Sequence, residues 1–197
     1  MFSSTSRLVL ASGSSYRKAL LDRLGVQFTV CSAGIDESPH PGEAPAAIAE
    51  RLAMEKARAV APTFPNHLII GSDQVATLDG VTTLGKPLSH PNATDQLMRL
   101  SGNQARFYTA VSFLNSKSNV VRSSTVETVV EFRSLSPTAI EDYLRRDQPY
   151  DCTGSAKIES FGIVLVRSVV SEDPSALIGL PLIALQDLLA AEGVHLI

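Results

Sequence analysis

The sequence predicts a protein of the α/β or α+β class with a mixed β-sheet. Three observations support this class. Segments typical of strands and helices alternate over the N-terminal half, and His67–Ala76 contains an apolar run typical of a strand buried on both faces. Farther along, Phe107–Phe132 has the pattern of a long antiparallel hairpin. The 197 residues contain no internal repeat or linker, so we expect a single domain over residues 1–197.

The composition is that of an ordinary globular protein and excludes several classes of function. Hydrophobic residues make up 44% of the chain, and the net charge of −3 gives no overall attraction for nucleic acid. No apolar run is long enough to cross a membrane, and the apolar stretch near the N-terminus is too short for a signal peptide. The two cysteines, Cys31 and Cys152, form no metal-binding or disulfide pattern. We therefore expect a cytoplasmic protein with reduced thiols and with neither a membrane nor a nucleic-acid partner.

The N-terminal segment has the pattern of an anion-binding turn. Leu8–Ala11 is typical of a short buried strand, Ser12–Ser15 of a tight turn, and Tyr16–Leu24 of a helix. Free N–H groups and the dipole at a helix N-terminus favour a bound anion, and Arg17 and Lys18 add positive charge there. The glycine spacing matches neither the P-loop nor the dinucleotide fingerprint. A serine-capped helix with two solvated basic residues explains the same pattern equally well.

Two carboxylates precede the first long helix. A strand over Gln27–Cys31 leads to Asp36 and Glu37, which stand at the start of an irregular, proline-rich loop. Such a pair either binds a hard divalent cation or is solvated. The next segment, Ala44–Val60, has apolar residues at helical spacing and is predicted to be an amphipathic helix. From this pattern alone, Lys56 is interpreted as a surface charge.

The central strand carries the acidic residue on which the functional prediction depends. Asp73 follows the apolar part of His67–Ala76 and is predicted to lie where this strand ends, held by the sheet. The alternative is an aspartate that caps a turn. An Asp-Gly pair then predicts a hairpin turn, with Thr82–Leu84 as the returning strand. Lys86 follows between a glycine and a proline, which restrict its direction.

The rest of the chain predicts a long hairpin followed by helices and one further strand. The expected elements are a helix over Asn92–Leu100, strands over Phe107–Asn115 and Val120–Phe132, a helix over Pro137–Arg146, a strand over Ile163–Val166 and a helix over Leu177–Ala191. The residues of Cys152–Gly162 are mostly small and polar, and their apolar positions follow neither helical nor strand spacing. The long hairpin also offers a surface for a homodimer.

Charged residues gather at the predicted strand ends and turns, with cations and carboxylates interleaved. They are Arg17, Asp36, Glu37, Asp73, Lys86, Lys157 and Glu159, with Lys56 as a further candidate. Such a set suits a polyphosphate bound with a divalent metal, because cations neutralise the phosphates and a carboxylate activates water. The sequence has no nucleophile elbow or Ser-His-Asp pattern, and its four histidines are interpreted as bystanders. Direct attack of water on a phosphoanhydride is therefore the simplest predicted chemistry.

Several short motifs occur along the chain in a fixed order. They are Leu8–Ser12 with Ser14 and Arg17, Asp36-Glu37, Glu55-Lys56-Ala57, Ile70–Asp73, Gly85-Lys86-Pro87, Ser101-Gly102, Tyr108-Thr109 and Gly179-Leu180-Pro181. In this order, which extends from Arg7 to Leu189, the chain resembles the Maf-like nucleotide pyrophosphatases. The resemblance implies cleavage between the α- and β-phosphates of a nucleoside triphosphate, with a divalent metal cation, Mg²⁺ or Mn²⁺, as cofactor. It also implies an elongated mixed sheet flanked by helices and split by a central cleft, related to the inosine-triphosphate pyrophosphatases.

The resemblance assigns roles to individual residues. Asp73 matches the family's proton acceptor. The positions that match the family's phosphate and metal site are Ser12, Arg17, Lys56 and Lys86, for substrate binding, and Glu37 and Asp73, for the metal. Ser15 departs from the pattern, which usually has proline there, so the turn is expected to be looser while no catalytic group is lost.

Three positions bear on the base that is recognised. At Tyr16, Gln74 and Glu159 the chain resembles the YceF branch of the family, similar to 7-methyl-GTP pyrophosphatases, with Tyr16 replacing that branch's usual tryptophan. Methylation at N7 makes guanine cationic, so an aromatic ring and a carboxylate favour it over a neutral pyrimidine. The alternative interpretation makes Tyr16 an ordinary helix residue and Glu159 a solvated loop charge.

Two other functions stay open at this point. The first is a pyrophosphatase acting on dTTP, UTP or another modified nucleotide, whose branch typically has arginine, threonine and glutamine at the same three positions. The second is a nucleotide-binding protein that regulates cell division without hydrolysis. A small-molecule nucleotide is the expected partner in each case.

Overall fold

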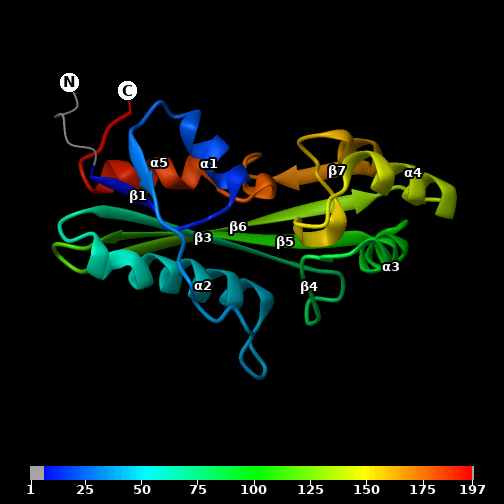
Figure 1. Cartoon of the computed structure of the whole chain (residues 1–197), viewed down its shortest axis with the longest axis horizontal. Helices are drawn as coiled ribbons and strands as arrows, with labels where there is room; N and C mark the ends of the chain where they lie inside the picture. The colour runs from blue at the N-terminus through cyan, green and yellow to red at the C-terminus, as the bar shows by residue number, and fades with distance from the viewer. Residues whose placement is uncertain (1–6, 197) are drawn as a thin grey trace.

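The computed structural model describes residues 7–196, which are built around one seven-stranded mixed β-sheet (Figure 1). The strand order is β2-β1-β3-β5-β6-β7, and β4 pairs with β3. β1 (Leu8–Leu10) is parallel to β2 (Phe28–Val30) and to β3 (Leu68–Thr77), and the other pairs are antiparallel. The predicted mixed α/β fold is confirmed, although the first six residues and the last residue of the expected domain lie outside the described part.

The long strands follow one another as antiparallel neighbours. β5 (Gln104–Asn115) pairs along its whole length with β6 (Val120–Phe132), as the hairpin pattern predicts, and β3 lies on the other side of β5. β4 (Thr83–Leu84) returns along the end of β3 at the predicted place. β7 (Val166–Ser171) pairs with the end of β6.

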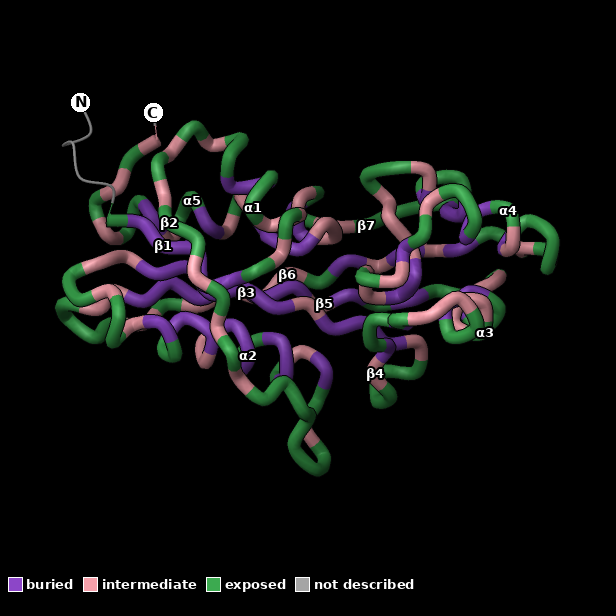
Figure 2. The backbone as a smooth tube through the Cα atoms, viewed as in Figure 1, coloured by how far each residue is buried: buried purple, intermediate pink, exposed green. Residues whose placement is uncertain are grey.

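Helices cover both faces of this sheet and pack at its far end. α2 (Pro45–Val60) lies along one face, whereas α1 (Ser15–Asp22) and α5 (Leu182–Ala191) pack together against the other (Figure 1). α3 (His90–Leu100) and α4 (Pro137–Asp147) share an apolar cluster at the opposite end of the long strands. Figure 2 shows the buried backbone concentrated along the sheet. Within residues 7–196, no helix has the length and apolar character needed to span a membrane.

α2 and β3 approach each other very closely at Gly71. A Cβ atom on Gly71 would lie 2.0 Å from the carbonyl oxygen of Ala53 and 2.9 Å from the backbone nitrogen of Ala57. The helix presents only small, fully buried residues at this contact, since Ala49 continues the same row. Because no side chain separates the two backbones, α2 lies low on the sheet, and its Lys56 reaches across to β3.

β3 is longer than expected, which changes the position of Asp73. The expectation that Asp73 lies where the strand ends is wrong, because β3 continues to Thr77 through its pairing with β5. On the other edge of β3, β1 pairs only as far as Ile70 and β4 begins only at Ala76. Residues 71–75 therefore face a gap in the sheet, and Asp73 lies in the middle of that gap.

The strand expected over Ile163–Val166 is a second error. Phe161–Leu165 forms a 3₁₀-helix, and β7 begins at Val166. Most residues of β7 are exposed, because this strand forms an edge of the sheet and has no layer over it. An exposed edge strand needs no continuous apolar run, so its position leaves little trace in the hydrophobic pattern.

The last helix begins later than expected. The sequence predicts a helix from Leu177, but Ala176–Ile178 is a separate 3₁₀ turn and α5 begins at Leu182. Gly179 lies between them with φ of 124°, a backbone conformation that L residues rarely adopt. The glycine therefore ends the first turn and redirects the chain toward the sheet.

We expect Gly71→Ala to destabilise the protein by about 2 kcal/mol or more, because the added methyl group must displace the α2 backbone. Urea unfolding gives the difference in the free energy of unfolding. Gly34→Ala is the matched control, since a Cβ atom there meets nothing within 4 Å. Equal stability of the two variants would contradict the close approach of α2 to β3.

Candidate active site

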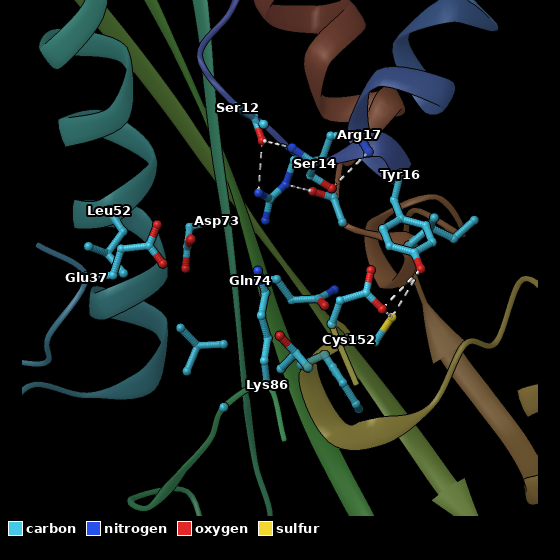
Figure 3. Close-up of a pocket in the computed structure, with 18 of the residues that line it drawn as sticks. Ser12, Ser14, Tyr16, Arg17, Glu37, Leu52, Asp73, Gln74, Lys86 and Cys152 are labelled. Atoms are coloured by element: carbon cyan, nitrogen blue, oxygen red, sulfur yellow. Dashed lines mark hydrogen bonds between the residues drawn. The ribbon is translucent and has the colours of Figure 1, made fainter. Parts of the chain in front are cut away.

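A cleft of about 690 Å³ lies at the gap in the sheet. The residues that follow β1 line one side of it, and those that follow β4 line another, with the middle of β3 between them. The segment after α4 and the turn before α5 complete the wall. Figure 3 shows Glu37 and Asp73 together at one end of the cleft and Tyr16 and Cys152 at the other. The central cleft implied by the resemblance is therefore present.

Lys56 is the centre of a charge cluster at one end of the cleft, where α2 and β3 form the wall. Its Nζ lies 2.5 Å from Oδ1 of Asp73 and 2.8 Å from Oε1 of Glu37. The side chains of Lys56 and Asp73 are only 8% and 9% exposed, whereas that of Glu37 is 56% exposed. The interpretation of Lys56 as a surface charge is therefore wrong. The helix pattern could not reveal it, because the partner carboxylates come from a distant strand and loop.

The charges around Glu37 keep its carboxyl group ionised. Partial burial raises the pKa of Glu37, but the hydrogen bond and charge of Lys56, together with the charges of Lys86 and Arg17, outweigh it and lower the pKa. Lys86 is exposed at the rim of the cleft, on the segment after β4. The cluster thus combines anionic oxygens with cations that come from three separate elements.

The carboxylates of Glu37 and Asp73 are chemically suited to a divalent cation. Mg²⁺ and Mn²⁺ prefer hard oxygen ligands, and Mg²⁺ is commonly bound by one or two carboxylates together with substrate phosphates. Glu37 and Asp73 contact the same ammonium group, so their oxygens lie close together. Among residues 7–196 no group of three or more His, Cys, Asp or Glu side chains is arranged around a common point. A cation held by these two carboxylates would complete its set of ligands with water or phosphate oxygens.

Arg17 is held in the cleft by the turns that surround it. Its Nε donates a 2.8 Å hydrogen bond to the carbonyl oxygen of Gly179, and its Nη1 donates to Oγ of Ser12 at 3.3 Å. Burial lowers the pKa of the Arg17 guanidinium, while the charges of Asp73 and Glu37 act in the opposite direction. Lys18 instead points away, forming an exposed ion pair with Asp22.

The turn before α1 has the geometry of an anion site. Ser14 is the N-cap, and its hydroxyl accepts a hydrogen bond from the backbone N–H of Arg17 at 3.4 Å. The Ser12 hydroxyl accepts one from the N–H of Ser14 at 3.2 Å. The first N–H groups of a helix have no acceptor within the helix, and the dipole favours negative charge there. Since Ser12, Ser14 and Arg17 all line the cleft, this helix end opens into it.

Tyr16 is anchored at the other end of the cleft by its phenol group. The hydroxyl donates to Oδ1 of Asp151 at 3.4 Å and accepts from the thiol of Cys152 at 3.6 Å. Burial raises the pKa of the Cys152 thiol to about 12, so the thiol is protonated and inert. Glu159 lines the same region; burial of its carboxyl group, with Asp147 nearby, raises its pKa even though the residue as a whole is exposed.

Gln74 lines the cleft, but its amide also holds the neighbouring turn in place. Its Nε2 lies 3.0 Å from Oγ1 of Thr109 and 3.1 and 3.0 Å from the carbonyl oxygens of Ala176 and Leu177. These acceptors together exceed the two N–H groups of the amide. Gln74 is therefore fixed by the turn before α5, which limits how far it can adapt to a ligand.

Two of the charged residues singled out in the sequence do not join the cleft. Asp36 accepts a hydrogen bond from the backbone N–H of Ser38, and Lys157 donates to the carbonyl oxygen of Asp147 at the end of α4. Neither of them lines the cleft, and among the described residues no histidine does so. The interpretation of the histidines as bystanders is consistent with this geometry.

Other residues of the cleft were missed in the sequence. Asp151 and Cys152 lie in a segment without any period, and the carbonyl oxygen of Gly179 acts through the backbone. Gly179 was identified only as part of the Gly179-Leu180-Pro181 motif, in which a glycine shortly before a proline indicates a turn. The side chains that a turn gathers cannot be found from such a signal.

A family model described as "Maf-like protein" matches residues 7–192. The chain belongs to the Maf family. Its curated Maf relatives include "7-methyl-GTP pyrophosphatase" of Methylobacillus flagellatus, 53% identical over 190 residues that cover 96% of this chain and 98% of that protein. The protein of the same name from Nitrosospira multiformis is 51% identical, covering 97% of this chain and 96% of its own.

Similarity of this Maf chain to solved structures is weaker. The Ham1 protein of Staphylococcus aureus has a TM-score of 0.45 and 17% identity, covering 64% of this chain and 71% of that one. Similarity at this level carries no argument about function. The expected relation to the inosine-triphosphate pyrophosphatases therefore stays a prediction.

We expect Lys56→Met to lower the free energy of unfolding by about 3 kcal/mol at neutral pH, because Asp73 is left buried without its counter-ion. The pKa of Glu37 is lowered by Lys56, so this part of the stability is fully present above about pH 4.5 and is lost as the pH falls through the lowered pKa. Urea unfolding at several pH values measures both effects.

Lys18→Met is the matched control for this variant. It breaks an ion pair whose side chains are 54% and 49% exposed, and such pairs contribute at most about 1 kcal/mol. A Lys56→Met protein as stable as the Lys18→Met protein would contradict a buried charge cluster at this site.

Proposed function

We propose that the chain hydrolyses 7-methyl-GTP to 7-methyl-GMP and pyrophosphate. Its Maf relatives with about 50% identity carry the name of this activity and are matched over nearly their full length. The structural observation that carries the proposal is the cleft itself, which is lined by buried Asp73, by its partner Lys56 and by the positive N-terminus of α1. This arrangement suits a triphosphate and a water molecule.

The triphosphate would bind between α1 and the segment after β4. The N–H groups at the start of α1 and the Arg17 guanidinium provide donors on one side, and the Lys86 ammonium provides one on the other. Because Ser12 and Gly179 hold Arg17, little side-chain freedom would be lost when a phosphate binds. Phosphate recognition would thus rest on donors that are already in place.

Glu37 and Asp73 would hold the divalent metal, Mg²⁺ or Mn²⁺. When bound, such a cation neutralises charge on phosphate oxygens and favours their attack by water. Lys56 keeps the two carboxylates together in the absence of other cations. Without it, repulsion between the carboxylates would separate them.

Asp73 would act as the general base. In this step it accepts a proton from water while the water oxygen forms a bond to the α-phosphorus. The bond between that phosphorus and the bridging oxygen to the β-phosphorus breaks, and pyrophosphate leaves with the electron pair. Arg17 and Lys86 would stabilise the charge that develops on the leaving group. Asp73 is suited to this role because β3 and Lys56 fix its direction.

The guanine base of the nucleotide would lie at the Tyr16 end of the cleft. Tyr16 provides an aromatic face, and Glu159 and Asp151 provide carboxylates on the same wall. A ring made cationic by methylation gains from both, whereas a neutral pyrimidine gains little. The bond to Asp151 would hold the Tyr16 ring in a fixed orientation and so offset part of the loss of the larger tryptophan ring.

A cytoplasmic location and a homodimer belong to the proposal as predictions. β5 and β6 form the hairpin expected to offer the dimer surface. The edge of β5 that faces away from β6 is already paired with β3. A dimer would therefore use the faces or the ends of this hairpin rather than that edge. The small-molecule nucleotide is the only other partner proposed.

Purified protein with Mg²⁺ should release pyrophosphate faster from 7-methyl-GTP than from GTP, dTTP, UTP or CTP.

Asp73→Asn should lower kcat about 10²- to 10⁴-fold, the range for loss of a general base. Asp36→Asn is the control, because Asp36 lies on the loop of Glu37 but outside the cleft. Undiminished activity of Asp73→Asn would exclude the mechanism, and no hydrolysis by the unaltered protein would favour the nucleotide-binding regulator.

Glu159→Gln should reduce the preference for 7-methyl-GTP over GTP, measured as the ratio of kcat/KM values, by about tenfold, because a charge-assisted contact becomes neutral. Glu50→Gln, an exposed change outside the cleft, should leave this ratio unchanged. If the Glu159 variant keeps the full preference, base recognition by this carboxylate is wrong, even where hydrolysis itself persists.

A further inference from the structure

Glu37 stands on a loop that has little of its own to hold it. Residues 31–44, between β2 and α2, contain no helix or strand, and residues 36–42 are all exposed. The apolar contacts of this loop lie at its start, where Cys31, Ala33 and Ile35 pack against the core clusters beside α2. Beyond Ile35, no buried apolar residue occurs until Pro45. The position of Glu37 beside Lys56 therefore needs a polar explanation.

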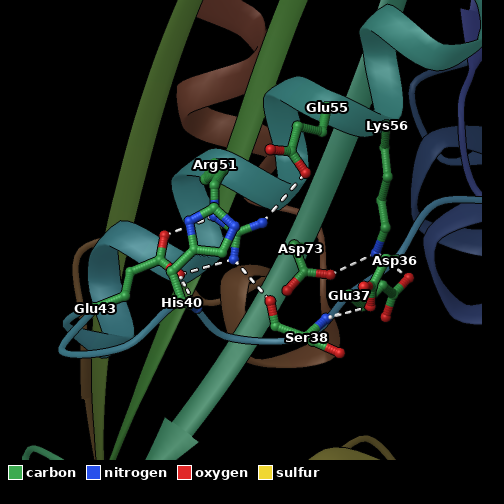
Figure 4. Close-up of polar contacts among 9 residues, drawn as sticks. All are labelled: Asp36, Glu37, Ser38, His40, Glu43, Arg51, Glu55, Lys56 and Asp73. Atoms are coloured by element: carbon green, nitrogen blue, oxygen red, sulfur yellow. Dashed lines mark hydrogen bonds and ion pairs between the residues drawn. The ribbon is translucent and has the colours of Figure 1, made fainter.

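Arg51 provides one, because its guanidinium spans this loop from α2 (Figure 4). Its Nε lies 2.6 Å from Oε1 of Glu43 and its Nη2 lies 2.7 Å from Oε2, a bidentate pair. Nη2 also donates to the carbonyl oxygen of Ser38, next to Glu37, at 3.2 Å. Nη1 donates to Glu55 on the following turn of α2 at 3.2 Å. One side chain thus joins Ser38 and Glu43 of the loop to the helix that carries Lys56.

The Arg51–Glu43 pair is stronger than most surface ion pairs. The side chains are only 15% and 13% exposed, and Glu43 also accepts a hydrogen bond from the backbone N–H of His40. The hydrogen bond from Arg51 lowers the pKa of Glu43 to about 2, so the pair is ionised at any physiological pH. A bidentate fork fixes direction as well as distance. Lysine carries its three N–H groups on a single nitrogen, so it could not reproduce the four contacts that Arg51 makes from three separate nitrogens.

We propose that Arg51 is a positioning residue, which fixes the 36–43 loop so that Glu37 is presented to the divalent cation beside Asp73. Arg51 does not line the cleft and touches no group that would react. It acts through Glu43 and Ser38 on a carboxylate that would otherwise sample many positions. The role of the cation rests on the proposed function, whereas the fixing of the loop does not.

The test compares Arg51→Lys and Glu43→Gln with Arg58→Lys, an exposed change on the same helix. Hydrogen exchange measures the four amides of the 38–43 segment, those of Ser38, His40, Gly42 and Glu43, since residues 39 and 41 are prolines. A titration with Mn²⁺ alone measures cation affinity. We expect about tenfold faster exchange confined to that loop, and about tenfold weaker Mn²⁺ binding, the lower end of the effect of groups that orient metal ligands. The Mg²⁺ concentration for half-maximal pyrophosphate release should rise with them, while kcat at saturating Mg²⁺ changes less.

The double variant separates this role from general stabilisation. If Arg51 and Glu43 act as one pair, Arg51→Lys with Glu43→Gln should be no worse than either change alone. Unchanged exchange of the 38–43 amides in Arg51→Lys, or faster exchange spread over the whole chain, would overturn the proposal. Hydrogen exchange requires neither cation nor substrate. It therefore tests whether Arg51 fixes the loop even if the protein hydrolyses no nucleotide and the proposed function fails.

Discussion

The contact between α2 and β3 at Gly71 is the constraint on which the site depends. Lysine side chains are long, but a buried ammonium is stable only where carboxylates meet it at hydrogen-bond distance. The missing side chain at Gly71 lets the helix lie low enough for Lys56 to reach Asp73 at 2.5 Å. A helix one side-chain layer higher would leave Asp73 buried and unpaired. Packing and charge therefore depend on each other at this point of the fold.

The gap in the sheet is the second condition for the site. β1 ends its pairing at Ile70 and β4 begins at Ala76, so the middle of β3 has a free edge in an otherwise continuous sheet. Side chains of a strand alternate between faces. Asp73 accordingly faces α2, while Ser72 and Gln74 bond to the turn before α5 on the other face. One short stretch of strand thus serves both walls of the cleft.

Local patterns predicted most of the fold, because alternation and helical spacing record burial directly. They failed at β7, where exposure removes the pattern, and at the start of α5, where a glycine interrupts an apolar run. For the site, the charged residues at turns were found, but their directions were not. Asp36 and Glu37 are neighbours in sequence and point to different partners. Such differences depend on contacts between distant segments, which neither composition nor period records.

The carbonyl oxygen of Gly179 accepts hydrogen bonds from Arg17 and Ser72, which precede it by 162 and 107 positions. These contacts join the first helix, the central strand and the turn before α5. A ribosome releases the N-terminal segments long before Gly179, so the growing chain cannot contain a finished cleft. Contacts over such separations also form slowly during folding. The cleft is therefore incomplete in a growing chain until Gly179 has left the ribosome and joined the two earlier segments.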